Sequence, residues 1–165
     1  MQTLAELINL RRRHLVRLAN QNGAAGEAQV LSERTGYLPR PRGQGAKNLL
    51  AALSESGITI KLASFDAVAL PAGQTVDFSD MDDIRKNLPN MTFIEIKTAN
   101  QPRVKPDFSG FFFAFTEGEI LASEALGERH KVLLVNKATS AVHLTSVAEI
   151  IARSKSLNWQ VSVQL

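Results

Sequence analysis

The chain has 165 residues, of which 44% are apolar and 21% are charged, and these values are typical of a single globular domain. It has no cysteine and only three histidines, which excludes disulfides and thiolate chemistry and argues against a zinc site. The sequence lacks an apolar run of about 18 residues and a signal-peptide pattern, so we expect a cytoplasmic protein with no membrane partner.

The net charge of +3 is distributed unevenly along the chain. Residues 1–60 hold eight Arg or Lys against four Glu, whereas residues 61–165 hold eleven basic against twelve acidic residues. A basic first third is typical of a chain that meets a polyanion, because Lys and Arg at phosphates release counterions on binding. The same imbalance also occurs in proteins whose surface charge serves only solubility.

The first third is predicted to be helical. Apolar residues recur at helical spacing over residues 3–20, and further helices are predicted over 25–35 and over about 46–56. Residues 37–45 are rich in Pro, Gly and Arg and are predicted to form a basic loop. Three basic residues in and beside this loop are candidates for contact with a DNA backbone: Arg40, Arg42 and Lys47.

From Ile58 onward the pattern changes to short apolar, β-branched runs. The predicted elements are, in order, a strand over 58–64, a strand over 66–70, a short helix capped by Ser79, a strand over 91–98, a loop over 100–110 and a buried aromatic strand over 111–115. Asp82 and Asp83 fall in the first turn of the short helix, where the helix dipole favours negative charge.

Two capping boxes organise the last third. Thr116 and Glu119 precede one helix, which runs to about Leu126, and Ser146 and Glu149 precede another, which runs to about Ser154. Strands are predicted over 131–136 and 141–145, which pair as a hairpin, and over 159–165. The order of elements predicts one domain of the α/β (α+β) class with a central mixed sheet flanked by helices, in which residues 1–56 form an N-terminal helical segment and residues 57–165 the sheet core.

The segment Phe93-Ile94-Glu95-Ile96-Lys97-Thr98-Ala99 places an acid and a lysine two positions apart in an apolar strand. Because side chains alternate along a strand, Glu95 and Lys97 share one face, about 7 Å apart at the backbone. A solvated strand face with a cross-strand charge pair also explains this spacing. A second interpretation is chemical. Glu95 and an Asp upstream in the chain can together hold a hard divalent cation, and Lys97 can orient the water that attacks the phosphate.

These residues resemble the PD-(D/E)XK nuclease superfamily, whose core is a helix, a three-stranded meander, a helix and a further strand. The matching pieces are Asp66 in its apolar strand, the Glu95-x-Lys97 signature, and the helix and strand that follow. Within the superfamily, the run from Phe93 to Val132 is similar to the restriction-nuclease-like C-terminal domain of NO VEIN proteins. That domain has a Glu-x-Lys-Thr strand, an aromatic strand, a Thr-x-x-Glu helix start and a strand after a glycine.

The resemblance covers about residues 57–150 and implies a restriction-endonuclease-like core with the activity of a Mg-dependent deoxyribonuclease. Asp66, Glu95 and the backbone carbonyl of Ile96 would hold Mg²⁺ or Mn²⁺, and Lys97 would position the attacking water. DNA is the expected partner, and cutting both strands would require a homodimer. A restriction or mobile-element defence component that depends on a partner protein fits this description.

An inactive nuclease fold that serves as a DNA-binding or assembly module is the alternative reading of the same resemblance. A protein that inhibits nucleases and folds similarly is a third, which the basic N-terminal third disfavours.

The upstream Asp departs from the family's pattern, because a helix-like insertion separates Asp66 from Glu95. The insertion is acidic, and it offers rival metal ligands: Asp77, Asp80, Asp82 and Asp83. Asp66 is preferred because it interrupts an apolar strand, where a buried charge is costly without compensation.

Several other residues are weighed for a role in the site. Glu27 is a candidate extra carboxylate, and Gln101 and Arg103, which follow the signature strand, are candidates for phosphate contact. Glu119 is attributed to its helix start. His130 and Lys131 begin a predicted strand and are weighed as groups that face the cleft, with a lone exposed histidine as the preferred interpretation of His130.

Overall fold

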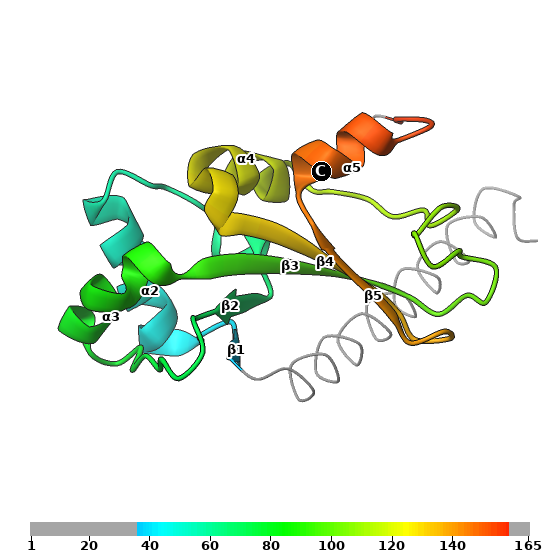
Figure 1. The fold of residues 1–165 in the computed structure, drawn as a ribbon. Helices are drawn as coiled ribbons and strands as arrows, with labels where there is room; N and C mark the ends of the chain where they lie inside the picture. The colour runs from blue at the N-terminus through cyan, green and yellow to red at the C-terminus, as the bar shows by residue number, and fades with distance from the viewer. Residues whose placement is uncertain (1–35, 159–165) are drawn as a thin grey trace, which may run out of the picture.

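The structure is a computed structural model that describes residues 36–158 (Figure 1). These residues form an α/β protein with a five-stranded mixed sheet and four α-helices. The elements predicted over 3–20, 25–35 and 159–165, together with Glu27, lie outside the described residues. Among the helices of residues 36–158, none has the length and the apolar character that crossing a membrane requires.

The sheet follows chain order from one edge to the other. Its strands are β1 (Tyr37–Pro39), β2 (Ala67–Ala69), β3 (Thr92–Ala99), β4 (His130–Asn136) and β5 (Ala141–Thr145). β3 and β4 run parallel, whereas the other neighbouring strands are antiparallel. The short β2 pairs with residues 92–94 of β3. The second half of β3 therefore extends beyond its partner on that side, and this is where the acid and the lysine lie.

All four α-helices of the described residues pack on one face of the sheet. They are α2 (Gly43–Glu55), α3 (Met81–Asn87), α4 (Glu117–Leu126) and α5 (Val147–Arg153). The first three bury Leu49, Ile84 and Leu126 against Phe93 of β3. α5 buries Val147 against Val132 of β4. Because the parallel register pairs Glu95 with Val132, the face that carries Phe93 and Glu95 is the helix-covered face.

The opposite face of the sheet is also apolar. Its buried residues are Ala67, Ile94, Ile96, Leu133 and Val135. Alternation along β3 therefore places both isoleucines on this face and leaves Glu95 and Lys97 on the other. The polar pair lies beneath helices and among apolar neighbours, and this environment distinguishes it from an ordinary solvated strand face.

Most elements predicted from residue 46 onward are confirmed to within a few residues. They are α2, the strands β2 to β5 and the helices α4 and α5. Both predicted capping boxes are present, because each Ser or Thr side chain accepts a backbone hydrogen bond that its Glu reciprocates. Such features depend on residues close together in sequence, which explains why they could be predicted.

Two predicted strands are wrong. Residues 58–64 hold a short 3-10 helix at Leu62–Ser64 and otherwise irregular backbone. Residues 111–115 also lack strand pairing. Their aromatic rings contact one another, with Phe113 4.9 Å from Phe111 and 5.3 Å from Phe115 between ring centroids. In both segments the apolar side chains are partly buried, as an apolar run predicts. The strand pairing that the run also suggested is absent.

Two further details differ from the prediction. The expected basic loop over 37–45 contains β1 and the start of α2, because residues 37–39 find a partner strand in β2. The short helix α3 begins after Asp80 and not after Ser79, since Asp80 Oδ1 accepts hydrogen bonds from the backbone of Asp82 and Asp83. Ser79 instead donates its hydroxyl to Asp77.

Candidate functional site

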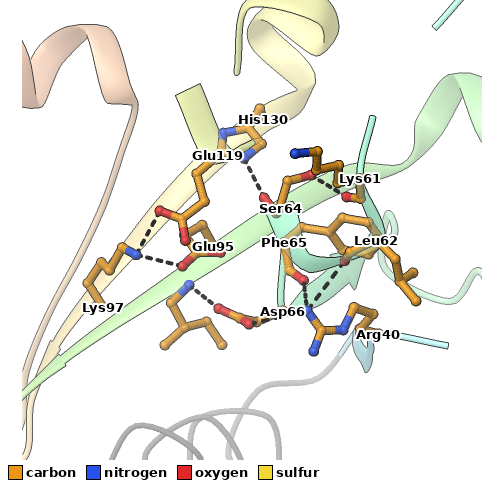
Figure 2. Close-up of polar contacts among 11 residues, drawn as sticks. Arg40, Lys61, Leu62, Ser64, Phe65, Asp66, Glu95, Lys97, Glu119 and His130 are labelled. Atoms are coloured by element: carbon orange, nitrogen blue, oxygen red, sulfur yellow. Dashed lines mark hydrogen bonds and ion pairs between the residues drawn. The ribbon is translucent and has the colours of Figure 1, made fainter. Parts of the chain in front are cut away.

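Lys97 forms the centre of a buried ionic cluster on the helix-covered face (Figure 2). Its Nζ lies 2.8 Å from Glu95 Oε1 and donates a 2.9 Å hydrogen bond to Glu119 Oε2. The three side chains are between 6% and 14% exposed. The common face predicted for Glu95 and Lys97 is confirmed by their contact, and their burial differs from what a solvated charge pair would show.

Asp66 reaches the same place from the segment that leads into β2. Its Oδ2 accepts a 2.8 Å hydrogen bond from the backbone N–H of Ile96, and its own N–H donates to the carbonyl of Ile94 at 2.8 Å. β2 has not yet begun at this level, so the Asp66 carboxylate takes the place of a strand partner for Ile96. Asp66 and Glu95 thus become neighbours, as Figure 2 shows.

Arg40 flanks Asp66 on the side away from Glu95 (Figure 2). Its Nη1 donates to the carbonyls of Phe65 at 2.8 Å and Leu62 at 3.3 Å, and lies 3.9 Å from Asp66 Oδ1. The backbone N–H of Arg40 also donates to the Asp66 carbonyl at 2.9 Å. Arg40 is therefore engaged with the turn that presents Asp66, and the DNA contact proposed for it stays a prediction.

Glu119 belongs to this cluster although the sequence interpretation gave it only a role at a helix start. It is the third residue of α4, and its Oε2 accepts from Thr116 N–H at 3.1 Å as well as from Lys97. In a strand–helix–strand unit, the helix starts near the carboxyl end of the strand before it. That rule, applied to the capping box that follows the Glu-x-Lys strand, was the signal that could have identified Glu119.

His130 is buried beside the cluster, and the interpretation of an exposed histidine is wrong. It opens β4 and is 1% exposed, because residue 130 pairs with the core residue Phe93. Its Nε2 donates to the Ser64 carbonyl at 3.2 Å, while Nδ1 has no hydrogen-bond partner among the described residues. Burial lowers the pKa of His130 and keeps the ring neutral near pH 7. The sequence around His130 carries no signal of this burial.

The cluster strongly shifts the pKa values of its titratable groups. Loss of water, and then the charge of Asp66, raise the pKa of Glu95 to about 9, although Lys97 opposes this shift. Burial also raises the pKa of Asp66, against the effect of the Ile96 hydrogen bond and Arg40. Burial lowers the pKa of Lys97, but Glu95 and Glu119 outweigh it and the net shift is upward. Lys97 therefore remains charged, and Glu95 is the carboxyl that readily takes up a proton.

The oxygen atoms at this point suit a divalent cation. Glu95 Oε2 is buried and has no hydrogen-bond partner among residues 36–158, which is costly for a carboxylate oxygen. A hard cation beside Glu95 and Asp66 would coordinate this oxygen and favour ionised Glu95. No set of three or more His, Asp or Glu side chains in the described part of the chain could hold a metal ion. Coordination here would thus combine two carboxylates with a backbone carbonyl.

The acidic residues of the insertion have local roles. Asp77 is exposed and accepts from the N–H and the hydroxyl of Ser79 at 2.8 and 2.6 Å. Asp80 caps α3, and Asp82 lies 2.8 Å from Arg85 in an exposed ion pair. Asp83 accepts from the backbone N–H of Asp77 at 2.7 Å. Asp66 is therefore the upstream Asp that contacts β3 at the signature residues.

The remaining candidates lie on the surface. Arg42 and Lys47 are exposed at the start of α2. Arg103 is exposed and donates to the Gln101 side chain at 3.1 Å, while the backbone of Gln101 bonds to the Asn136 side chain. These contacts fix Gln101 in the loop after β3. Arg42, Lys47 and Arg103 stay available to a ligand in solution.

The sequence matches no protein-family model, and no curated protein or solved structure matches it. Function is therefore inferred from the chemistry of the side chains themselves.

Proposed function

We propose that this protein is a metal-dependent nuclease of the PD-(D/E)XK type, which hydrolyses phosphodiester bonds in DNA. The observation that carries the proposal is that Asp66, Glu95 and Lys97 lie together, just before β2 begins to pair with β3. Two carboxylates on adjoining backbone segments, with a lysine two residues beyond the second, form the set that metal-assisted hydrolysis of a phosphodiester requires.

Asp66, Glu95 and the backbone carbonyl of Ile96 would hold Mg²⁺ or Mn²⁺. When bound, the metal polarises the scissile phosphate and lowers the pKa of a bound water. Asp66 is preorganised for this role by the Ile96 N–H and by the turn that Arg40 fixes. Glu95 Oε2 is buried, so water is largely excluded around it. Fixed, desolvated groups of this kind stabilise charge more strongly than mobile groups in water.

Lys97 would orient the attacking water and offset negative charge that develops on the phosphate. Its position is fixed from several directions, since Nζ contacts both Glu95 and Glu119 and lies 5.3 Å from the centroid of the Phe115 ring. The raised pKa of Lys97 keeps the ammonium charged throughout the neutral range. A charged and immobile donor beside the metal ligands is what this step needs.

The order of elements supports a restriction-endonuclease-like core. β1, β2 and β3 form an antiparallel series, and α4 and the parallel strand β4 follow. This is the sequence of strand, helix and strand expected for the superfamily, with α2 and α3 inserted between the strands. A role in restriction or defence, a homodimer and a partner protein remain predictions.

Cleavage of supercoiled plasmid with Mg²⁺, Mn²⁺ or EDTA tests the proposal. We expect metal-dependent nicking by the wild type and a loss of at least about 100-fold in Glu95→Gln and Lys97→Ala, because each removes a group that acts in the transition state. Asp82→Ala is the matched control, since it removes an exposed acid of the insertion and should retain activity. Nicking that is unchanged in Glu95→Gln, or that persists in EDTA, would refute the assignment.

A second candidate function is an inactive nuclease fold that binds DNA or assembles with a partner. The observation that favours it is the existing engagement of Asp66 by Ile96 and Arg40, and of Lys97 by two carboxylates, which satisfies these charges without a metal. Isothermal titration calorimetry separates the candidates. Absence of both nicking and divalent-metal binding by the wild type would support the inactive module.

A further inference from the structure

Glu119 has two hydrogen-bonding functions that use the same oxygen atom. Its Oε2 accepts from the backbone N–H of Thr116, which completes the cap of α4, and from Lys97 Nζ. The side chain of Glu119 is 7% exposed, so both contacts are made in a largely dry environment. A capping glutamate at a helix start usually faces solvent, where its charge favours the helix dipole. Here the hydrogen bond from the Thr116 N–H directs the Glu119 carboxylate inward, toward β3.

Lys97 has two carboxyl partners, Glu95 and Glu119, and the proposed function would engage Glu95 with a metal ion. Glu95 contacts Lys97 through Oε1 and leaves Oε2 unpartnered among the described residues. A metal ion held by Glu95 and Asp66 would withdraw much of the negative charge that Glu95 offers to Lys97. A buried cation that loses its counter-charge is strongly destabilised. Without another partner, Lys97 would turn away from the reaction centre.

We infer that Glu119 is a positioning residue, which holds the Lys97 ammonium in the site when Glu95 is engaged by a metal ion. The inference rests on the proposed function for its role in catalysis, but the contact that it describes can be tested separately. Glu119 acts through Lys97, and the hydrogen bond from the backbone N–H of Thr116, which an alanine at position 116 would also donate, fixes the direction of its carboxylate. The exposed acid next to it, Glu117, lacks this role.

Two substitutions separate the cap from the contact with Lys97. Glu119→Gln keeps the length of the side chain and an oxygen that can accept from Thr116 N–H, but it removes the negative charge. Thr116→Ala removes the hydroxyl that accepts from Glu119 N–H at 3.2 Å and leaves the carboxylate in place. If Glu119 acted only in the cap, Glu119→Gln would be the milder variant, because it retains the acceptor for Thr116 N–H whereas Thr116→Ala removes the acceptor for Glu119 N–H.

Chemical acetylation of Lys97 tests the contact without depending on activity. Acetic anhydride is applied below the melting temperature, and mass spectrometry compares the modification of Lys97 with that of Lys86, an exposed reference. Glu95→Gln serves as the background because its neutral amide cannot act as a counter-charge for Lys97. We expect Lys97 to stay protected in Glu95→Gln and in Glu95→Gln/Thr116→Ala, and to react about tenfold faster in Glu95→Gln/Glu119→Gln. Equal protection in all three variants would overturn the inference.

Kinetics of DNA cleavage tests the catalytic consequence. We expect Glu119→Gln to lower kcat by about 10- to 100-fold with little change in KM, because it displaces a group that acts in the transition state. Thr116→Ala should lower the melting temperature and retain kcat. A kcat of Glu119→Gln equal to that of the wild type would overturn the inference while leaving the nuclease proposal intact. A wild type without metal-dependent cleavage would refute the nuclease proposal, and the acetylation result would still decide the contact.

Discussion

The residue Glu95 combines three conditions that rarely occur together in a strand. It is buried, it lies beside the carboxylate of Asp66, and one of its oxygens has no hydrogen-bond partner among the described residues. Each condition disfavours the charged form, and the contact with Lys97 only partly compensates. Carboxyl groups with strongly perturbed pKa values concentrate at functional sites, because burial and like charges there match the pKa to the task of the group.

This perturbation predicts how stability depends on pH. The folded state raises the pKa of Glu95 from 4.5 to about 9, so it binds this proton more tightly than the unfolded chain does. The resulting stabilisation is fully present below about pH 4.5 and is lost as the pH rises through about 9. Glu95→Gln cannot ionise and should escape this loss.

Melting temperatures at pH 5 and pH 9 measure the effect. We expect Glu95→Gln to melt close to the wild type at pH 5 and roughly 5 °C above it at pH 9. Asp82→Asn, which changes an exposed carboxylate, controls for the general effect of removing an acid. A difference between Glu95→Gln and the wild type that is the same at both pH values would contradict the raised pKa.

At the scale of elements, two junctions build the site. One is the late start of β2 at Ala67, which leaves the second half of β3 open to the side chain of Asp66. The other is the start of α4, which delivers Glu119 to the carboxyl half of β3. At strand ends and helix starts, backbone N–H and C=O groups lack regular hydrogen-bond partners. Side chains that hydrogen-bond to these groups have a fixed orientation. The side chains of the ionic cluster therefore sit on rigid supports.

The role of Asp66 at the first junction can be separated from its charge. Asp66→Ala leaves the buried N–H of Ile96 without an acceptor, and we expect it to lower the free energy of unfolding by about 1–3 kcal/mol. Asp66→Asn retains an acceptor oxygen and should cost less stability, yet it should abolish metal-dependent nicking. Urea denaturation and the plasmid assay measure the two effects. Equal destabilisation by both variants would show that the charge, and not the hydrogen bond, stabilises this junction.

At the scale of the whole molecule, the described helices bury apolar side chains against one face of the sheet. α4 lies over β4 (Figure 1) and carries Glu119 of the site. The groups that form the site come from the turn before β2, from β3 and from α4, which are distant in sequence. A ligand that binds this arrangement binds only the folded protein. Metal binding should therefore be visible as a change in global stability.

Thermal unfolding in Mg²⁺ tests this coupling. Mg²⁺ at about 100 times its dissociation constant should stabilise the wild type by about 2.7 kcal/mol, and excess EDTA should reverse the gain. Glu95→Gln should show no such gain, because it lacks the ligand charge. Asp82→Asn should respond like the wild type. A gain of the same size in Glu95→Gln would place the metal at another site.

Much of the local structure could be predicted from the sequence. The apolar alternation around Glu95 predicted its strand and the face that it shares with Lys97, and both capping boxes marked true helix starts. The aromatic run at Phe111 failed as a predictor, because burial of rings does not require strand pairing. The burial of His130 was missed, because it depends on residues distant in sequence, namely its register partner Phe93 and the Ser64 carbonyl.

The sequence by itself determined the features that depend on close neighbours: the strand with Glu95 and Lys97 on one face, and the cap that includes Glu119. Only the tertiary structure decided which distant groups meet them. Asp66 bonds to Ile96 across 30 positions, Glu119 to Lys97 across 22, and His130 to Ser64 across 66. Side-chain direction follows from local backbone geometry, whereas strand register and helix packing are set by burial over the whole chain.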